Sequence, residues 1–317
     1  MLLTPAMNDF ISSKNTTDSH SITFSVFISS YNYGRFLACA IDSVLAQTLQ
    51  PIEIVVADDG STDNTLEVVA GYGDRVTFES FNRAGIIAVR NSMLRNKKGS
   101  WVLNLDADDW IEPQFLERAA ALIVGTGCPD NLAFVYADRV DFGAYSRHLV
   151  SPAFDPVRFR RKNYVPFDAL FRCEIVSRFQ FDPAFKEGWE DYDFLITLVK
   201  NNFVGIRLPD PPVHCRVHSS SRTSKTFDAD KMQRLMRQIT AKHTDFFSAE
   251  EAVAAVAYFA PQAVLRHRIC EYVWAKQYFA AAWLFMKVLI TYPSALFSRR
   301  VLHWLLRIPV EKDDTFE

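Results

Sequence analysis

Four short runs of β-branched and aromatic residues alternate with helix-like segments in the N-terminal third of the chain. The runs are Thr23–Ser29, Ile52–Ala57, Val76–Glu79 and Trp101–Leu105. Apolar residues recur at helical spacing between them, which predicts a helix in each connection. Strands joined by helices lie parallel and are buried on both faces. The sequence therefore predicts an α/β fold with a mostly parallel central sheet and flanking helices.

The elements downstream of residue 110 are less regular. We expect helices over Pro113–Val124, Phe167–Arg178 and Phe194–Asn201, strands over Leu132–Tyr136, Val204–Leu208 and Val213–His218, irregular chain over 138–163, and a helical region over 229–317. Ser61 or Thr62 is expected to cap the helix after the second strand, because serine and threonine favour that position.

Three of the predicted strands end in residues that can bind a ligand. The first is followed by Ser29-Ser30-Tyr31, the second by Asp58-Asp59, and the fourth by Asp106, Asp108 and Asp109. Ligands of such sheets bind beyond the carboxyl ends of the strands. Three neighbouring carboxylates repel one another, and hard oxygen ligands suit Mg²⁺ or Mn²⁺. An acidic turn that merely ends a strand is the alternative at this point.

A second acidic cluster, Glu190, Asp191 and Asp193, follows Trp189 at the start of a predicted helix. Carboxylates at a helix N-terminus gain about 0.3–1 kcal/mol each from the helix dipole, which accounts for one or two of them. A carboxylate in this position can also act as a general base towards a hydroxyl.

Arg216 and His218 alternate on a predicted strand and therefore share one of its faces. Beside the serine-rich segment that follows, His218 is a candidate ligand for a metal or a diphosphate. A structural histidine next to a solvated loop is the alternative.

Composition excludes several classes of protein. The net charge of −2 over 317 residues gives no reason to expect nucleic-acid binding. The five cysteines include no CxxC pair, so neither a zinc site nor a disulfide framework is indicated, and a reducing cytoplasmic location fits best. Residues 1–21 are polar and are expected to form a flexible tail without a signal peptide.

The segment 262–309 is strongly basic and has a single acidic residue, Glu271. Its expected last helix has an apolar stripe and a basic stripe. The apolar stripe consists of Phe297, Val301, Trp304, Leu305 and Ile308. Two interpretations stay open. Either the segment contacts an anionic membrane surface peripherally, on the inner face of the membrane, or it packs on the rest of the chain.

Seven segments together resemble the family 2 glycosyltransferases with the GT-A fold. In order they are VFISSYN (26–32), SVLAQT (43–48), VVADDGSTDNT (55–65), Asn82-x-x-Gly85 with Ala88-x-Arg90-Asn91, Leu105-Asp-Ala-Asp-Asp109, Trp189-Glu-Asp-Tyr-Asp193, and Arg216-x-His218. The resemblance implies a GT-A catalytic domain over 22–228, with a nucleotide-binding half (22–110) and an acceptor half (111–228), followed by the helical region.

The resemblance also implies roles for single residues. The nucleotide would contact Ser29, Tyr31, Asp59, Asn82, Arg90 and Asp106. Asp108 and His218 would hold Mn²⁺ or Mg²⁺, Asp191 would be the catalytic base, and Trp189 and Glu190 would lie beside the acceptor. The implied reaction moves a sugar from a nucleotide-sugar donor, expected to be a UDP-sugar, to a saccharide or lipid-linked acceptor with inversion. Synthesis of a cell-envelope glycan or an exopolysaccharide is the expected context.

Two other functions share this architecture. A sugar-phosphate nucleotidyltransferase is disfavoured because Ser29–Gly34 is aromatic and has one glycine, whereas such enzymes need a glycine-rich basic loop there. A non-catalytic scaffold is disfavoured because Asp108, Asp191 and His218 are all present. The chain departs from the family pattern at Arg83 and Ile86-Ile87, near the nucleotide, and at Arg178–Asp182, near the acceptor.

Overall fold

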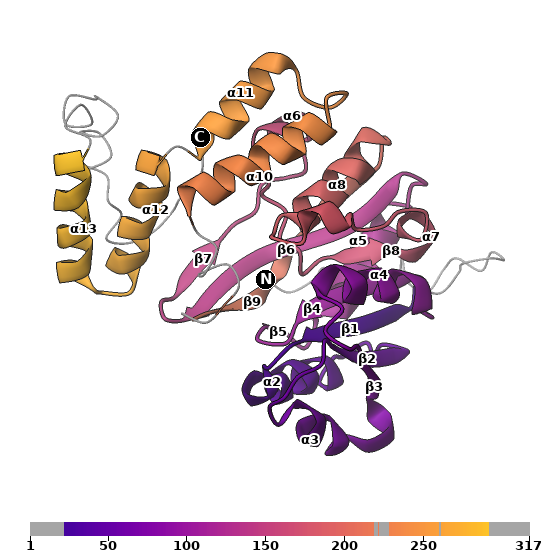
Figure 1. Ribbon diagram of the computed structural model, residues 1–317. Helices are drawn as coiled ribbons and strands as arrows, with labels where there is room; N and C mark the ends of the chain where they lie inside the picture. Colours follow the sequence, from indigo (N-terminus) through magenta and orange to yellow (C-terminus); the bar gives the residue numbers. More distant parts are fainter. Residues whose placement is uncertain (1–21, 219–220, 222–227, 260, 292–317) are drawn as a thin grey trace, which may run out of the picture.

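A computed structural model describes residues 22–218, 221, 228–259 and 261–291 of the chain (Figure 1). The expected tail over 1–21 lies outside these residues. The N-terminal part contains four parallel strands in the spatial order β3-β2-β1-β4. The strands are β1 (Phe24–Ser30), β2 (Glu53–Asp58), β3 (Thr77–Ser80) and β4 (Trp101–Asp106). Their connections contain α2 (Gly34–Leu45), α3 (Thr65–Ala70), the short η1 (Gly73–Arg75) and α4 (Ile86–Asn96). The predicted α/β alternation is confirmed.

The sheet continues beyond β4 with strands of mixed direction, in the order β8-β6-β9-β5, and β7 pairs with β6. The strands are β5 (Trp110–Ile111), β6 (Leu132–Gly143), β7 (Arg147–Leu149), β8 (Leu170–Arg172) and β9 (Val204–Val217). β8 runs antiparallel to both β4 and β6, whereas β6 and β9 are parallel. Helices α5 (Phe115–Gly125) and α8 (Glu190–Lys200) lie in the connections, as do the short α6 (Pro156–Arg161), α7 (Cys173–Val176) and η2 (Pro183–Phe185).

Several local predictions for this half were wrong. The segment 138–163, expected to be irregular, contains the end of β6, β7 and α6. The expected helix Phe167–Arg178 is β8 followed by the one-turn helix α7, because Val102 and Leu103 of β4 pair with Phe171 and Leu170. This pairing outweighs the helical spacing of the segment.

Two further predictions need correction. The two strands expected over Val204–Leu208 and Val213–His218 form the single strand β9, which continues through a cis peptide bond before Pro211 and a register shift opposite Ala137 and Arg139. Helix α3 begins later than expected, after Asn64, and neither Ser61 nor Thr62 caps it. Ser61 instead donates its backbone N–H to Asp58, at 2.8 Å.

The sheet separates two apolar cores. Val26 and Ile28 of β1 face the core formed with α2 and α5, while Phe27 faces the core formed with α4 and α8. All three residues are fully buried. Figure 1 shows α2 and α3 on one side of the strands and α4 and α8 on the other. Burial on both faces explains why these strands are almost continuously apolar.

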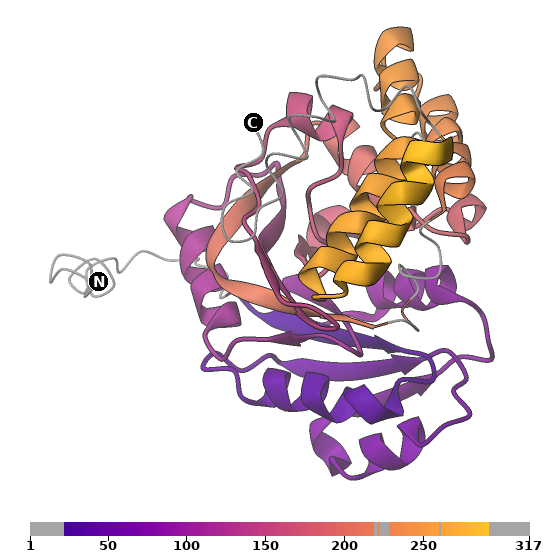
Figure 2. The same cartoon turned by 90° about the vertical axis from the view of Figure 1, so that its left-hand side faces the viewer.

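Within the described residues, the sheet is followed by α10 (Ala229–Lys242), α11 (Ala249–Tyr258), α12 (Pro261–Trp274) and α13 (Tyr278–Thr291). Figures 1 and 2 place the α12–α13 pair at the periphery of the molecule, with α13 outermost. No helix in the described part of the chain has the length and apolar character needed to cross a bilayer. The amphipathic helix expected between Phe297 and Ile308 lies outside the described residues.

A buried ion pair joins α4 to α8. Arg90 Nη1 lies 2.5 Å from Glu190 Oε1, and both residues are almost completely shielded from solvent. The guanidinium carbon of Arg90 also lies 3.9 Å from the ring centroid of Phe167. Removing one partner of a buried pair leaves an uncompensated charge, which is more costly than the pair itself is stabilising.

We expect Arg90→Met to lower the free energy of unfolding by about 3–5 kcal/mol, because the Glu190 carboxylate loses its buried cation. Chemical denaturation measures this change. Arg95→Met is the matched control, since Arg95 lies exposed on the same helix, and a change within about 0.5 kcal/mol is expected there. Equal effects of the two substitutions would contradict a structural role for the pair.

Candidate active site

The carboxyl ends of β1, β2 and β4 lie side by side. Parallel pairing sets Ser29 opposite Asp106 and Ser30 opposite Asp58. The Ser29 hydroxyl donates to Asp106 Oδ1 at 3.0 Å, so two of the predicted nucleotide-binding residues are in direct contact. The polar residues that end these three strands therefore lie close together at one edge of the sheet, as predicted.

The turn after β4 meets the end of β9 at this edge. His218 Nε2 lies 2.9 Å from Asp108 Oδ2, and their side chains are 14% and 11% exposed. The imidazole ring packs against the rings of Tyr33 and Phe36, at centroid distances of 5.6 Å and 5.2 Å, and those two rings also contact each other. The two predicted metal ligands, which are far apart in sequence, thus present donor atoms to the same point.

Asp109 links the turn after β4 to strand β9. It is buried, and its Oδ1 accepts the backbone N–H of Arg216 at 2.7 Å. Arg216 Nε in turn donates to the carbonyl oxygen of Asp108 at 3.1 Å. These two bonds fix the end of β9 against the turn and set the position of His218 relative to Asp108.

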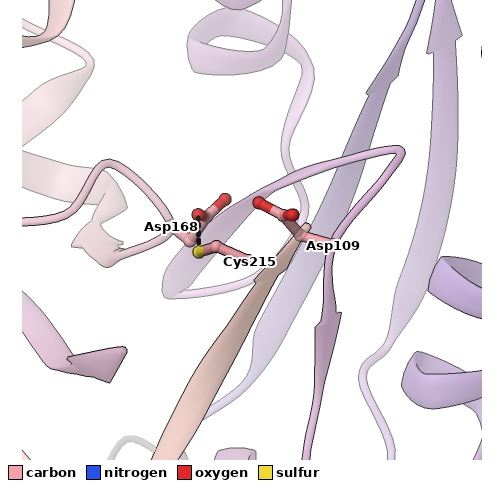
Figure 3. Close-up of side chains that lie close together, drawn as sticks. All are labelled: Asp109, Asp168 and Cys215. Atoms are coloured by element: carbon pink, nitrogen blue, oxygen red, sulfur yellow. Dashed lines mark hydrogen bonds between the residues drawn. The ribbon is translucent and has the colours of Figure 1, made fainter. Parts of the chain in front are cut away.

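Two residues that sequence reasoning missed lie beneath the turn. Asp168, buried just before β8, accepts the backbone N–H of Asp106 at 3.3 Å and the Cys215 thiol at 3.5 Å. Figure 3 shows Asp109, Asp168 and Cys215 pointing towards one another from three different segments. One donor atom from each lies within 4.8 Å of the others. No motif marks Asp168, because its place depends on β8 pairing with β4.

The clustered carboxylates raise each other's affinity for protons. Burial, together with Asp106, raises the pKa of Asp108 above its usual range and that of Asp168 to about 7. Burial and the charge of Asp168 raise the pKa of Asp109 well above its usual range. Burial and the nearby Asp108 also raise the pKa of Tyr33 to about 12. A strongly negative potential with carboxylate and imidazole donors fits a hard divalent cation such as Mg²⁺ or Mn²⁺.

The loops after β2 and β3 are tied together by Asp59. Both of its carboxylate oxygens accept the backbone N–H of Gly85 at 3.1 Å. Gly60, beside it, has a φ of +75°, and a Cβ there would lie 2.9 Å from the carbonyl oxygen of Phe81. Asn82 lies exposed in the second loop. The loops therefore form one surface beside the strand ends.

Tyr31 and Arg83 contact each other on that surface. The guanidinium carbon of Arg83 lies 5.4 Å from the ring centroid of Tyr31, and Arg83 Nη2 donates to the Tyr31 hydroxyl. Arg83, where the chain departs from the family pattern, thus covers the ring expected to stack on a base. Arg90, by contrast, is buried and reaches the site through Asp106, with Nη2 and Oδ1 3.6 Å apart. Direct contact between Arg90 and a nucleotide stays a prediction.

The three carboxylates at the start of α8 have different environments. Glu190 is fully buried against Arg90. Asp193 is buried between His243 Nε2 and Lys242 Nζ, each 2.8 Å from one of its oxygens. Asp191 is the one of the three that keeps access to solvent. Asp191 is therefore the least enclosed carboxylate of this cluster.

Trp189 precedes these residues with a φ of 64°, in the left-handed region that costs a bulky residue energy. Its ring packs on Phe259, at a centroid distance of 4.8 Å. The aromatic contact helps to hold the strained turn that begins α8.

Comparisons with known proteins agree with this geometry. The model of the family "Glycosyl transferase family 2" matches residues 25–184, about half of the chain. A chondroitin synthase of Pasteurella multocida is 38% identical over 96 residues, which are 29% of this chain and 10% of that enzyme. The chain spans less than half the length of the first curated relatives it matches.

Two solved structures share the fold. The crystal structure of TarS 1–349 from S. aureus in complex with UDP has a TM-score of 0.58 at 22% identity, over 75% of this chain and 70% of that one. The mannosyltransferase PcManGT from Pyrobaculum calidifontis, in complex with GDP-Man and Mn²⁺, has a TM-score of 0.55 at 18% identity, over 92% and 85%. The predicted GT-A fold is confirmed, and the chain belongs to glycosyl transferase family 2.

Proposed function

We propose that this chain is an inverting, divalent-metal-dependent glycosyltransferase that moves a sugar from a nucleoside diphosphate donor to an acceptor hydroxyl. The observation that carries the proposal is the convergence of Asp108 and His218, 2.9 Å apart, at the carboxyl edge of the sheet. This edge is where α/β sheets bind nucleotides. Family membership supports the reaction class.

In this proposal the donor nucleotide lies over the ends of β1 and β2. The Tyr31 ring stacks on the base, Asp59 accepts from the ring N–H of the base, and Asn82 lies beside it. Ser29 and Asp106, already hydrogen-bonded to each other, contact the ribose. We propose UDP as the nucleotide, which the likeness to UDP-bound TarS supports.

Asp108 and His218 are the residues that would hold the metal. When bound, Mn²⁺ or Mg²⁺ neutralises the negative charge that develops on the departing diphosphate. The likeness to PcManGT, which is described with Mn²⁺, supports such a metal. Asp109 and Asp168 act from below by fixing the backbone that carries these ligands.

Asp191 is the proposed catalytic base. It takes the proton from the acceptor hydroxyl as that oxygen bonds to the anomeric carbon, and the bond from this carbon to the diphosphate breaks. A single displacement of this kind inverts the anomeric centre and needs no nucleophilic side chain. Glu190 is a positioning residue, because it is buried against Arg90, and Trp189 borders the acceptor.

We propose a saccharide or lipid-linked glycan as the acceptor, in cell-envelope or exopolysaccharide synthesis. The 38% identity with a chondroitin synthase supports a polysaccharide product. The proposed division places donor binding in residues 22–110 and acceptor binding in residues 111–228.

We expect UDP to bind only when Mn²⁺ or Mg²⁺ is present. The substitution Asp108→Asn should weaken UDP binding at least about tenfold, because a neutral amide is a poorer ligand for a hard cation. Isothermal titration calorimetry with UDP, GDP, ADP and CDP, with and without metal, measures this. Asp74→Asn, at an exposed site in η1, should bind as the wild type does. Metal-independent binding, or binding of none of the four nucleotides, would refute the proposed donor site.

We expect Asp191→Asn to bind UDP normally and to transfer sugar at least about 100-fold more slowly, because the amide cannot accept the hydroxyl proton. Release of UDP from UDP-GlcNAc and other UDP-sugars, with oligosaccharide acceptors, measures transfer, again with Asp74→Asn as control. NMR of the product should show an inverted anomeric centre. Wild-type transfer by Asp191→Asn would remove Asp191 from the role of base, and a retained configuration would exclude single displacement.

A further inference from the structure

Helix α13 has large apolar residues on two opposite faces. The inner face packs against α12, where Ala281 and Ile269 are buried and Leu284 and Phe285 pack beside them. The outer face consists of Phe279, Trp283, Met286 and Ile290, which are 95%, 67%, 55% and 77% exposed. Their spacing of four, three and four residues aligns them along one side of the helix. We call these four residues the outer α13 face.

Single exposed apolar residues are normal on protein surfaces, but an aligned row of this kind is not. The row lies on the outermost helix of the molecule (Figure 2), so a large partner can approach it without meeting the catalytic sheet. Tyr278, 62% exposed, begins the same helix. Tryptophan and tyrosine are the residues enriched where a membrane meets water.

The charged residues of the sequence segment that contains α13 are all basic. No aspartate or glutamate lies between Glu271 and Glu311, whereas Lys276 and Lys287 are present and exposed. The ammonium group of Lys287 lies 5.5 Å from the ring centroid of Trp283, beside the apolar row. Lysines that border an apolar helix face suit a surface of anionic headgroups.

The length of α13 decides how such a surface would be bound. Its 14 residues extend about 21 Å, which is shorter than the about 30 Å hydrocarbon core of a bilayer. Over its described length, Tyr278–Thr291, the helix can therefore lie in the plane of the interface but is too short to cross the bilayer.

We propose that the outer α13 face binds the surface of an anionic lipid membrane. Phe279, Trp283, Met286 and Ile290 enter the boundary between headgroups and acyl chains, and Lys276 and Lys287 contact lipid phosphates. Charge favours this partner over a second copy of the chain, because a symmetric pairing would bring the same lysines of both copies together. The proposal rests on α13 alone and does not depend on the proposed transferase function.

Co-flotation of the full chain with lipid vesicles tests the proposal. We expect the wild type to float with vesicles of phosphatidylglycerol and phosphatidylcholine, and to do so much less with phosphatidylcholine alone or at high salt. The double variant Phe279→Ser/Trp283→Ser should reduce vesicle-bound protein at least about tenfold, because two large apolar groups no longer enter the lipid. Lys276→Glu/Lys287→Glu should reduce it comparably by reversing the charge.

The matched control is Leu66→Ser/Val253→Ser, which removes two exposed apolar side chains, 62% and 72% exposed, from α3 and α11. It should float as the wild type does, and circular dichroism checks that every variant is folded. Absence of wild-type flotation, or equal flotation of control and α13 variants, overturns the proposal. The proposal is also overturned if light scattering shows a dimer for the wild type and a monomer for the Phe279→Ser/Trp283→Ser variant, since the face would then join two copies. UDP binding is measured in parallel, because it tests the transferase proposal independently of vesicle binding.

Discussion

Mutual repulsion among four carboxylates at the end of β4 is the constraint around which this structure is organised. Asp106, Asp108, Asp109 and Asp168 come from one turn and from the segment before β8, and three of them have raised pKa values. Three groups of the surrounding chain contact these carboxylates and offset part of the repulsion. They are the backbone N–H of Arg216, the ring of His218 and the guanidinium of Arg90. Electrostatic repulsion makes such a cluster of carboxylates unfavourable by itself. The cluster suits a site that binds a cation together with its substrate.

The acidic residues at the start of α8 also differ from one another in burial and in their partners. Glu190 and Asp193 are both buried; Glu190 pairs with Arg90 of α4, and Asp193 contacts Lys242 and His243 at the end of α10. Asp191 is less enclosed, so a single carboxylate of the cluster is left towards solvent. The motif is therefore one catalytic candidate held by two structural anchors, and a mutation at either anchor would act on Asp191 through the position of α8.

Much of the fold and part of the site could be predicted from the sequence because local signals agreed with the final packing. The strands β1, β2 and β4 are apolar throughout and end in polar residues, so both their existence and the edge they share are visible. The meeting of Asp108 with His218 followed from the family resemblance. The failures have a common physical origin. β8 is three residues long and is set by its pairing with β4, β9 continues through proline, and Asp168 becomes part of the site only through that pairing. Non-local contacts decide these features, and no local pattern encodes them.

The contacts of Asp193 show how much of the chain is needed to hold helix α8 in place. The last motif ends at His218, yet the buried Asp193 takes its partners from Lys242 and His243, at the end of α10. A chain cut after the last motif would expose helix α8, and the buried carboxylate of Asp193 would lose both of these partners. The smallest piece able to hold α8 in place therefore extends through α10, and gene fusions or truncations that keep the family signature intact can still discard part of its scaffold.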